Sequence, residues 1–144
     1  MGLTQPSRPL VLAIDVGNTS IAFGLFEGAK LVRRHRCLTH AFRPADLKPF
    51  ARHRGKIAEA IVCSVVPKLN ARLESALKKS LGSRVTLLGR DREVPIPNKT
   101  AKPKQVGMDR LVNAWAAWQC FKRPVICVDF GTATTFDVIS RRGE

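Results

Sequence analysis

Two stretches of this chain repeat one pattern: LVLAIDVGNTSIAFGL at residues 10–25 and PVICVDFGTATTFDVI at residues 124–139. In each stretch an apolar run leads into Asp-x-Gly, then into small polar residues and a second apolar run. This pattern predicts a β-hairpin whose turn follows an aspartate, Asp15 or Asp129. The amide hydrogens of such a turn can surround phosphate oxygens, and Gly17 allows the backbone to approach them closely. A plain hairpin explains either copy alone, whereas two copies suggest two related half-domains that close on one nucleotide.

Aspartate at the end of a strand also suits a hard cation. Asp15 is a candidate ligand for Mg²⁺, usually through water, and Asp129 is a second carboxylate of the same kind. A zinc site is not expected, because the three histidines do not have the spacing of zinc ligands.

The composition is typical of one globular domain, with 144 residues of which 44% are apolar. No apolar run approaches the roughly 18 residues that span a bilayer, and the N-terminus lacks the pattern of a signal peptide. We therefore expect a cytoplasmic protein without membrane contact and with a disordered leader at residues 1–9. The cysteines lack CxxC spacing and are expected to be reduced core thiols, three of them in apolar runs: Cys63, Cys120 and Cys127.

The chain is strongly basic, with 25 Lys and Arg against 11 Asp and Glu and a formal net charge of +14. Such a charge can attract anionic substrates or nucleic acid, or it can simply keep the surface solvated. The basic residues are scattered, there is no tyrosine, and no set of aromatic residues is interleaved with them. A solvated surface is therefore favoured, and nucleic-acid binding is disfavoured.

The order of predicted elements indicates an α/β fold. Strands are expected at residues 10–15, 20–27, 31–38, 56–66 and 84–88, with helices at 44–54, 67–81 and 109–121 and an irregular loop at 89–106. This order resembles an RNase H-like (actin-like ATPase) half-domain with a mixed sheet, over residues 10–122. Residues 123–144 hold only the first hairpin of a second such half-domain, so we expect a fragment of a longer product. Residues expected to face inward from the first and last helices are Leu47, Phe50, Ala51, Leu111, Ala114, Trp115, Trp118 and Phe121.

A third motif, VGMDRLVNAW at residues 106–115, places Asp109 where the loop enters a helix. Asp109 can be an N-cap that accepts the amide hydrogens of Leu111 or Val112. Alternatively it presents its carboxylate to a substrate hydroxyl, with Gly107 allowing close approach and Arg110 binding an anion. Spacing alone leaves both roles open and favours the cap.

Four motifs together resemble the type III pantothenate kinase family of the actin, hexokinase and acetate-kinase superfamily: DVGNTSI, CSVVP (63–67), PKQVGMDR (103–110) and DFGTATTFDVI. The resemblance covers residues 10–140 in the family's order. It implies a phosphotransferase that moves the γ-phosphoryl group of ATP to the primary hydroxyl of pantothenate. The product is 4′-phosphopantothenate, in the first step of coenzyme A biosynthesis. ATP with Mg²⁺, a monovalent cation (K⁺ or NH₄⁺) and a homodimer of the full-length protein are also implied.

The resemblance assigns roles to individual residues. Asp109 is the implied general base, Asp129 binds the monovalent cation and Thr132 contacts ATP. The implied pantothenate contacts are Gly107, Met108, Asp109 and Arg110. The implied ATP-phosphate segment consists of Asp15, Val16, Gly17, Asn18, Thr19, Ser20, Ile21 and Ala22.

The chain departs from the family pattern at Thr100, where the family often has a substrate-contacting tyrosine seven residues before Gly107. The family's C-terminal half does not follow residue 144, so we expect little or no kinase activity from this segment alone. Three alternatives stay open: a nucleic-acid-binding or regulatory protein of the same fold, another small-molecule kinase of the superfamily, and an RNase H-like nuclease. The nuclease is disfavoured because its metal carboxylates must cluster around one centre, whereas each Asp-x-Gly turn here supplies residues that can surround phosphate.

Overall fold

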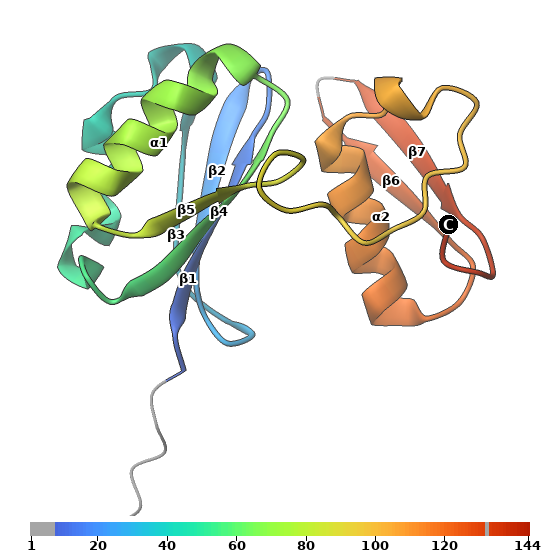
Figure 1. The fold of residues 1–144 in the computed structure, drawn as a ribbon, viewed down its shortest axis with the longest axis horizontal. Coiled ribbons are helices and arrows are strands. Elements are labelled where there is room, and N and C mark those ends of the chain that lie inside the picture. The colour runs from blue at the N-terminus through green and yellow to red at the C-terminus, as the bar shows by residue number, and fades with distance from the viewer. Residues whose placement is uncertain (1–7, 132) are drawn as a thin grey trace, which may run out of the picture.

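The computed structural model of the chain describes residues 8–131 and 133–144 (Figure 1). Most of the predicted leader and Thr132 therefore lie outside the described residues. The strands are β1 (Leu10–Val16), β2 (Ser20–Glu27), β3 (Lys30–Leu38), β4 (Ile57–Ser64), β5 (Arg84–Leu87), β6 (Val125–Phe130) and β7 (Thr134–Ile139). The helices are α1 (Pro67–Leu81) and α2 (Met108–Phe121), with 3₁₀ helices η1 (Thr39–Ala41), η2 (Pro44–His53) and η3 (Pro103–Gln105).

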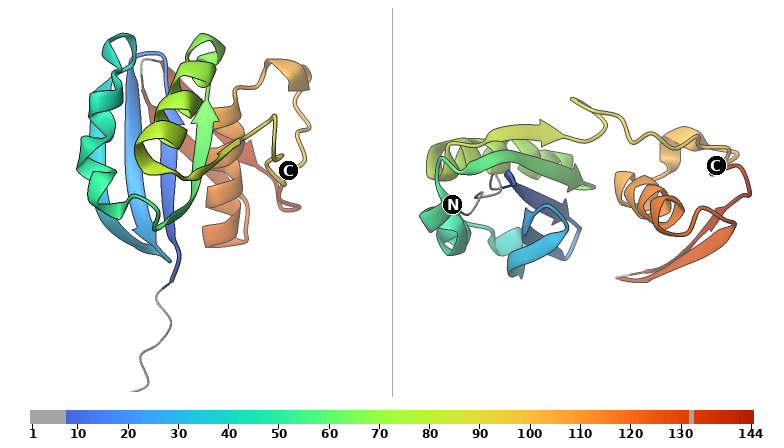
Figure 2. Two further views of the ribbon diagram at one scale, coloured as in Figure 1. Left: turned by 60° about the vertical axis from the view of Figure 1, so that its left-hand side comes forward. Right: turned by 90° about the horizontal axis from the view of Figure 1, so that it is seen from below.

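The first five strands form one mixed sheet in the order β3-β2-β1-β4-β5 (Figure 2). The strands β1, β2 and β3 are joined by two antiparallel hairpins, whereas β4 lies parallel to β1 and β5 parallel to β4. Parallel neighbours need a crossover connection, which α1 provides between β4 and β5. The strand order and directions confirm the predicted α/β, RNase H-like half-domain with a mixed sheet.

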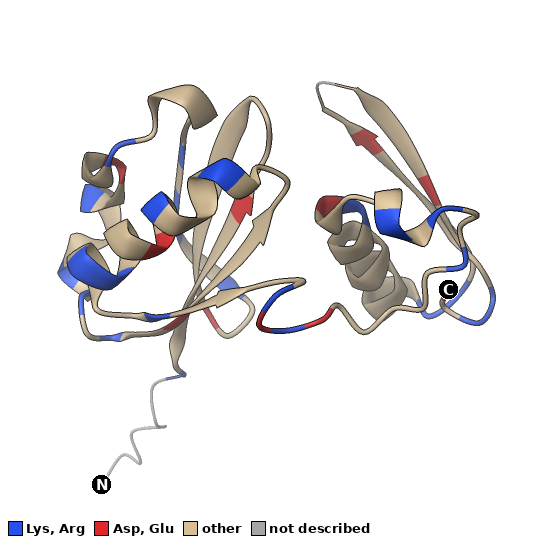
Figure 3. Cartoon of the chain, turned by 45° about the horizontal axis from the view of Figure 1, so that its top comes forward, with Lys and Arg blue, Asp and Glu red and all other residues tan. Residues whose placement is uncertain are grey.

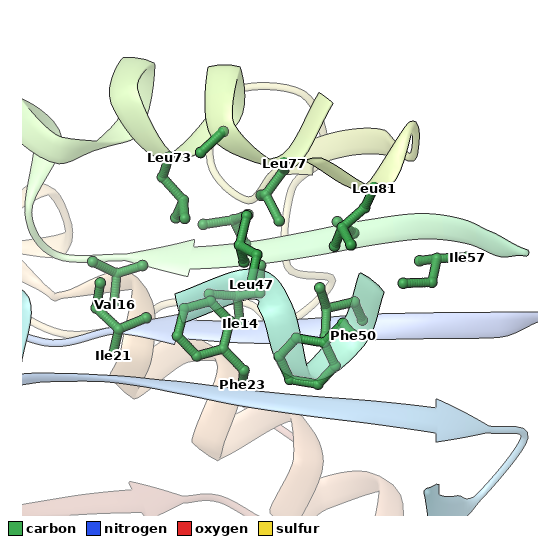
Figure 4. Close-up of a cluster of buried hydrophobic side chains, with 14 of the residues drawn as sticks. Ile14, Val16, Ile21, Phe23, Leu47, Phe50, Ile57, Leu73, Leu77 and Leu81 are labelled. Carbon is green, nitrogen blue, oxygen red and sulfur yellow. The ribbon is translucent and has the colours of Figure 1, made fainter. Parts of the chain in front are cut away.

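The hydrophobic core lies on one face of this sheet, beneath α1 and η2 (Figure 4). Side chains alternate along a strand, so Leu12, Ile14 and Val16 of β1 are buried while Ala13 and Asp15 face the opposite side. The helices close the core with Leu47, Phe50, Leu73, Ala76, Leu77 and Leu81. Each large side chain that is fully buried there contributes roughly 1.5–3 kcal/mol.

The helix α1 begins and ends where the sequence predicts. Pro67 occupies the first helical turn, where an amide hydrogen would lack an intrahelical acceptor. Gly82 caps the other end with a left-handed φ of 67°, and its amide donates to the carbonyl of Lys78 at 3.1 Å. Among the described residues, no helix combines the length and apolar character that crossing a membrane requires.

Three predictions about burial are wrong. Ala51 is exposed, because the three-residue turns of η2 put Leu47 and Phe50 on its inner side and rotate Ala51 away from it. Phe121 is 53% exposed at the last position of α2, where Arg123 lies over its ring. Cys120 is exposed beside it and is not a core thiol, although all four cysteines are free.

The helix α2 and the β6–β7 hairpin form a smaller unit beside the sheet (Figure 1). Strand pairing puts Ile126 opposite Val138 and Val128 opposite Phe136 on one face of this hairpin. That face, which we call the open hairpin face, consists of the exposed residues Ile126, Val128, Phe130, Phe136 and Val138. The other face packs on α2, which also contacts β4. A domain boundary near residue 122 stays a prediction.

Candidate active site

Three of the sequence motifs meet at one edge of the five-stranded sheet. Asp15 at the end of β1 lies opposite Cys63 of the parallel strand β4. The amide of Val65 donates to the carbonyl of Val16 at 3.0 Å. A Cβ placed on Gly107 would lie 3.7 Å from Val65, so the start of α2 touches the same place. The predicted phosphate segment, the CSVVP segment and the VGMDR segment therefore adjoin.

The turn between β1 and β2 is anchored by a buried threonine. The amide of Gly17 donates to the carbonyl of Ser20 at 3.0 Å, so this amide is not a free donor for a ligand. The advantage of Gly17 is that it has no side chain to block the approach of a ligand. Thr39, which is 8% exposed, donates its hydroxyl to the carbonyl of Gly17 at 2.7 Å and its amide to the carbonyl of Thr19 at 3.0 Å. Sequence reasoning missed Thr39, although a polar residue at the end of a predicted strand was a usable signal.

Other residues of the predicted phosphate segment have different surroundings. Val16 and Ile21 are fully buried in the core, so only their backbone atoms can face a ligand. Asn18 is exposed at the turn, and Ala22 lies beside Asp15 on the uncovered face of the sheet. In the second Asp-x-Gly hairpin, the turn after β6 is closed by the amide of Gly131, which donates to the carbonyl of Ala133 at 3.3 Å.

Asp109 is the second residue of α2. Gly107 occupies the N-cap position, and the amide of Leu111 donates to its carbonyl at 3.4 Å. The interpretation of Asp109 as the N-cap is therefore wrong. Its Oδ1 accepts the amide hydrogen of Arg110 at 2.9 Å. A Cβ on Gly107 would collide with the Asp109 carboxylate, so the glycine makes the observed position of that carboxylate possible.

The carboxylate of Asp15 lies within the electrostatic influence of two other aspartates, Asp109 and Asp129. Burial raises the pKa of Asp15 above its usual 3.8, and the charges of Asp109 and Asp129 raise it further. Arg36 opposes this shift. It lies on the same face because Asp15 pairs with Ala22, which pairs with Arg36 on the next strand. The fold thus brings together three aspartates that belong to three separate motifs.

The three carboxylates fit hard cations rather than a closed metal cage. Within the described part of the chain, no group of three or more His, Cys, Asp or Glu residues is arranged to hold one metal ion. Mg²⁺ commonly binds one or two carboxylates and completes its shell with water and substrate phosphates. The mutual repulsion at Asp15 gives such cations a favourable electrostatic environment.

Cys63 lies next to this charge and stays a neutral thiol. Burial, followed by the charges of Asp15 and Asp109, raises the pKa of Cys63 to about 12. A thiol with such a pKa is a poor nucleophile at neutral pH. Cys63 therefore packs against the site without chemistry of its own.

An apolar groove of about 380 Å³ runs along the uncovered face of the sheet and reaches α2 at Val112. Its charged lining residues are Asp15 and Arg34. The small residues Ala22 and Gly24 leave the space that larger side chains would fill. The groove is thus suited to an apolar ligand group beside Asp15.

A second cavity of about 350 Å³ lies between α2, β7 and the loop at 96–100, and Thr100 and Arg110 both line it. The side chain of Asn98 holds the loop, because it accepts both the amide and the hydroxyl of Thr100, at 3.1 and 2.8 Å. Nε of Arg110 donates to Oδ1 of Asp137 at 2.6 Å. Sequence reasoning missed Asn98 and Asp137. A charged residue in the apolar strand TTFDVI was a signal for the latter.

Known proteins that are similar to this chain belong to the family that the four sequence motifs resemble. The family model described as type III pantothenate kinase matches residues 11–144. The chain belongs to the type III pantothenate kinase family. This membership confirms the resemblance found in the four motifs.

Curated relatives named type III pantothenate kinase include proteins from Moorella thermoacetica, Myxococcus xanthus and Geobacter sulfurreducens, each 38% identical to this chain. Each alignment covers 94% of this chain, and it covers 57% of the first relative and 56% of the other two. The chain therefore spans about half the length of the curated relatives it matches. A crystal structure of a Bacteroides thetaiotaomicron protein with an actin-like ATPase fold and unknown function is 14% identical. It aligns with a TM-score of 0.43, and the alignment covers 61% of this chain and 35% of the Bacteroides chain.

Proposed function

We propose that this chain supplies the phosphate-binding and pantothenate-binding half of an ATP-dependent pantothenate kinase. The reaction forms 4′-phosphopantothenate, the first intermediate of coenzyme A biosynthesis. The observation that carries the proposal is the convergence of Asp15, Asp109 and Asp129 in a chain of this family.

Asp109 is the proposed general base. Its carboxylate accepts or orients the proton of the primary hydroxyl while that oxygen forms a bond to the γ-phosphorus. The bond between the γ-phosphorus and the bridging oxygen breaks, and ADP leaves with the electron pair. Gly107 supports this role, since its missing side chain leaves room for the carboxylate.

The proposed ATP contacts are the segment from Asp15 to Ala22 together with Thr132. Asp15 would hold Mg²⁺ through water, and Asp129 would hold K⁺ or NH₄⁺. When bound, these cations neutralise charge on the phosphates. Arg36 supports the assignment as a positive charge on the same face of the sheet.

The proposed pantothenate pocket is the cavity between α2, β7 and the loop at 96–100. Of the positions that the family resemblance links to pantothenate, Thr100 and Arg110 line this cavity. Its volume of about 350 Å³ lies within the range of small-molecule sites. Met108 and Gly107 complete the proposed substrate segment at the start of α2.

The remaining features of the proposal concern the whole protein. We expect a cytoplasmic homodimer in which the part of the family beyond this chain completes the adenine side and most dimer contacts. Residues 1–144 alone would then have little or no kinase activity. The open hairpin face supports this view, since its apolar side chains are of the kind that further structure covers.

The test is a coupled assay of ADP release by the complete gene product, with and without pantothenate and K⁺. We expect turnover that needs pantothenate and is stimulated by K⁺ or NH₄⁺. Absence of pantothenate-dependent turnover with every cation would overturn the proposal. Turnover with another small alcohol or acid instead would favour a different kinase of the superfamily.

A nucleic-acid-binding or regulatory role is the second candidate, favoured by the net charge of +14. Lys and Arg occur on both units and in several loops rather than on one stripe (Figure 3). A binding protein has no need of the Asp109 carboxylate, so Asp109→Asn would leave its nucleic-acid affinity unchanged. The kinase would lose turnover while it still binds ATP.

A further inference from the structure

An ion pair joins the start of α2 to β7. Nε of Arg110 donates to Oδ1 of Asp137 at 2.6 Å, and Nη2 lies 2.5 Å from the same oxygen. Nη2 also donates to the carbonyl of Phe136 at 3.0 Å. The Asp137 side chain is 10% exposed and that of Arg110 is 36% exposed. The guanidinium is thus held along one edge by a single strand.

Fold stability alone is a poor explanation of this pair. The Asp137 side chain is 10% exposed, and removing its charge from water costs free energy that an ion pair often fails to recover. Moreover, Oδ2 of Asp137 is buried and has no hydrogen-bond partner among the described residues. An unsatisfied buried oxygen is unfavourable and calls for another reason. A function in placing the arginine is such a reason.

Arg110 forms part of the wall of the proposed pantothenate pocket. Arg110 and Asp137 both line that cavity, and Nη1 makes no hydrogen bond to any residue within 8–131 and 133–144. The other charged residues of the lining are Lys99 and Glu144. Glu144 is paired with Arg142 at 2.9 Å, so it is not a competing partner for Arg110.

We propose that Asp137 is a positioning residue that fixes the Arg110 guanidinium in the cavity wall, so that its remaining edge binds the carboxylate of the substrate. The inference rests on the proposed function, because pantothenate is the anionic ligand that it names. An unrestrained arginine would lose considerable rotamer entropy on binding an anion. The pair with Asp137 removes that freedom before the ligand arrives, which is the general advantage of preorganisation.

The adjacent residue gains from the same arrangement. Neighbouring residues on an α-helix are about 100° apart around its axis. Arg110 is engaged with the hairpin, whereas Asp109 interacts electrostatically with Asp15. Asp137 therefore holds the positively charged Arg110 guanidinium on the side of the pocket, away from the Asp109 carboxylate that is proposed as the base.

The test compares the affinities of the complete gene product for pantothenate and for pantothenyl alcohol, which carries a hydroxyl in place of the carboxylate. Calorimetry is carried out on the wild type, Asp137→Asn, Arg110→Met and the double variant. We expect each single variant to bind pantothenate about 10-fold or more weakly, equal to at least about 1.4 kcal/mol. Binding of the alcohol should change by less than about 2-fold. The double variant should be no weaker than Arg110→Met, because Asp137 acts through Arg110.

Asp91→Asn is the matched control, since Asp91 also pairs with an arginine but lies on the surface at Arg90. ATP affinity reports that each variant is folded. Unchanged pantothenate affinity in Asp137→Asn would overturn the inference, and so would an equal loss for acid and alcohol, which would mean a merely structural role. A wild type that binds ATP but neither ligand would instead overturn the proposed function, and this inference with it.

A measurement on the 144-residue chain tests the Arg110–Asp137 pair without any ligand, and therefore independently of the proposed kinase function. The Nε–H signal of Arg110 in a nitrogen-15 NMR spectrum should exchange slowly with water in the wild type and rapidly in Asp137→Asn. Rapid exchange in the wild type would show that the pair does not form, and would overturn the inference whatever the kinase assay gives.

Discussion

The two Asp-x-Gly hairpins share a sequence pattern but have opposite surroundings. In the β1–β2 hairpin the inner face is sealed by α1 and η2, and Leu12 and Ile21 are fully buried. In the β6–β7 hairpin the apolar residues of the open hairpin face are exposed to solvent, with Phe130 82% and Val138 72% exposed. Local pattern thus determines that a hairpin forms, whereas its burial depends on whether helices from elsewhere in the fold cover its apolar face.

The site lies between these two regions and belongs fully to neither. Asp15 comes from the first hairpin, Asp129 from the second, and Asp109 from the helix that contacts both. The finished sheet fixes one side of the site, and the small unit fixes the other. Substitutions in the two regions should therefore have different effects on turnover, stability and thiol reactivity.

The largest expected effect is at the residue between the two hairpins. Asp109→Asn in the complete gene product should lower kcat about 10²–10⁴-fold, because the amide cannot accept the hydroxyl proton. ATP affinity should stay within a few-fold of the wild type. Steady-state kinetics and calorimetry measure the two quantities. A variant that retains more than half of its turnover would show that the base lies elsewhere.

The second effect separates the finished core from the open hairpin face. Leu77→Ala should lower the free energy of unfolding by about 2–5 kcal/mol, because Leu77 is fully buried and its loss leaves a cavity. Val138→Ala, at an exposed position, should change it by less than about 0.5 kcal/mol. Urea denaturation of the 144-residue chain measures both. Similar losses for the two would contradict the contrast between the regions.

The third effect concerns the thiols of the two regions. Cys63 should react with iodoacetamide at pH 8 at least about 100-fold more slowly than Cys120. The pKa of Cys63 is raised to about 12, and its side chain is buried, whereas Cys120 is exposed. Peptide mass spectrometry over a time course gives the two rates. Comparable rates would show that the sheet edge around Asp15 is open.

The smallest effect tests the charge at the site. The pKa of Asp15 is raised, so the folded state holds the proton more tightly than the unfolded state, and the ionised carboxylate destabilises the fold. Asp15→Asn should therefore raise Tm at pH 7. The difference should shrink toward pH 4, near the ordinary value of 3.8, where protonation removes the charge in the wild type. A lower Tm than wild type at pH 7 would contradict the proposed repulsion.

Local signals predicted most of the fold. Pro67 and Gly82 marked both ends of α1, and the apolar run of residues 10–15 marked β1 as a strand. Their physical effects act within a few residues, so the sequence carries them directly. Ala51 was misplaced because a 3₁₀ helix and an α-helix differ in which residues share a face.

The candidate site was predicted only in part. The motifs contained Asp15, Asp109 and Asp129, but sequence spacing does not reveal that three motifs adjoin. Thr39 and Asp137 were missed because their importance lies in partners distant along the chain, Gly17 and Arg110. Likewise, helical periodicity places Phe121 on the apolar side of α2, but its position at the last residue of the helix leaves it exposed.

The most direct test is to measure 4′-phosphopantothenate formation by the complete gene product and by residues 1–144 side by side, by mass spectrometry with ATP, Mg²⁺ and K⁺. We expect product from the complete protein and little or none from residues 1–144, which span about half the length of the curated relatives. Formation by residues 1–144 at a rate similar to that of the complete protein, or by neither, would contradict this expectation.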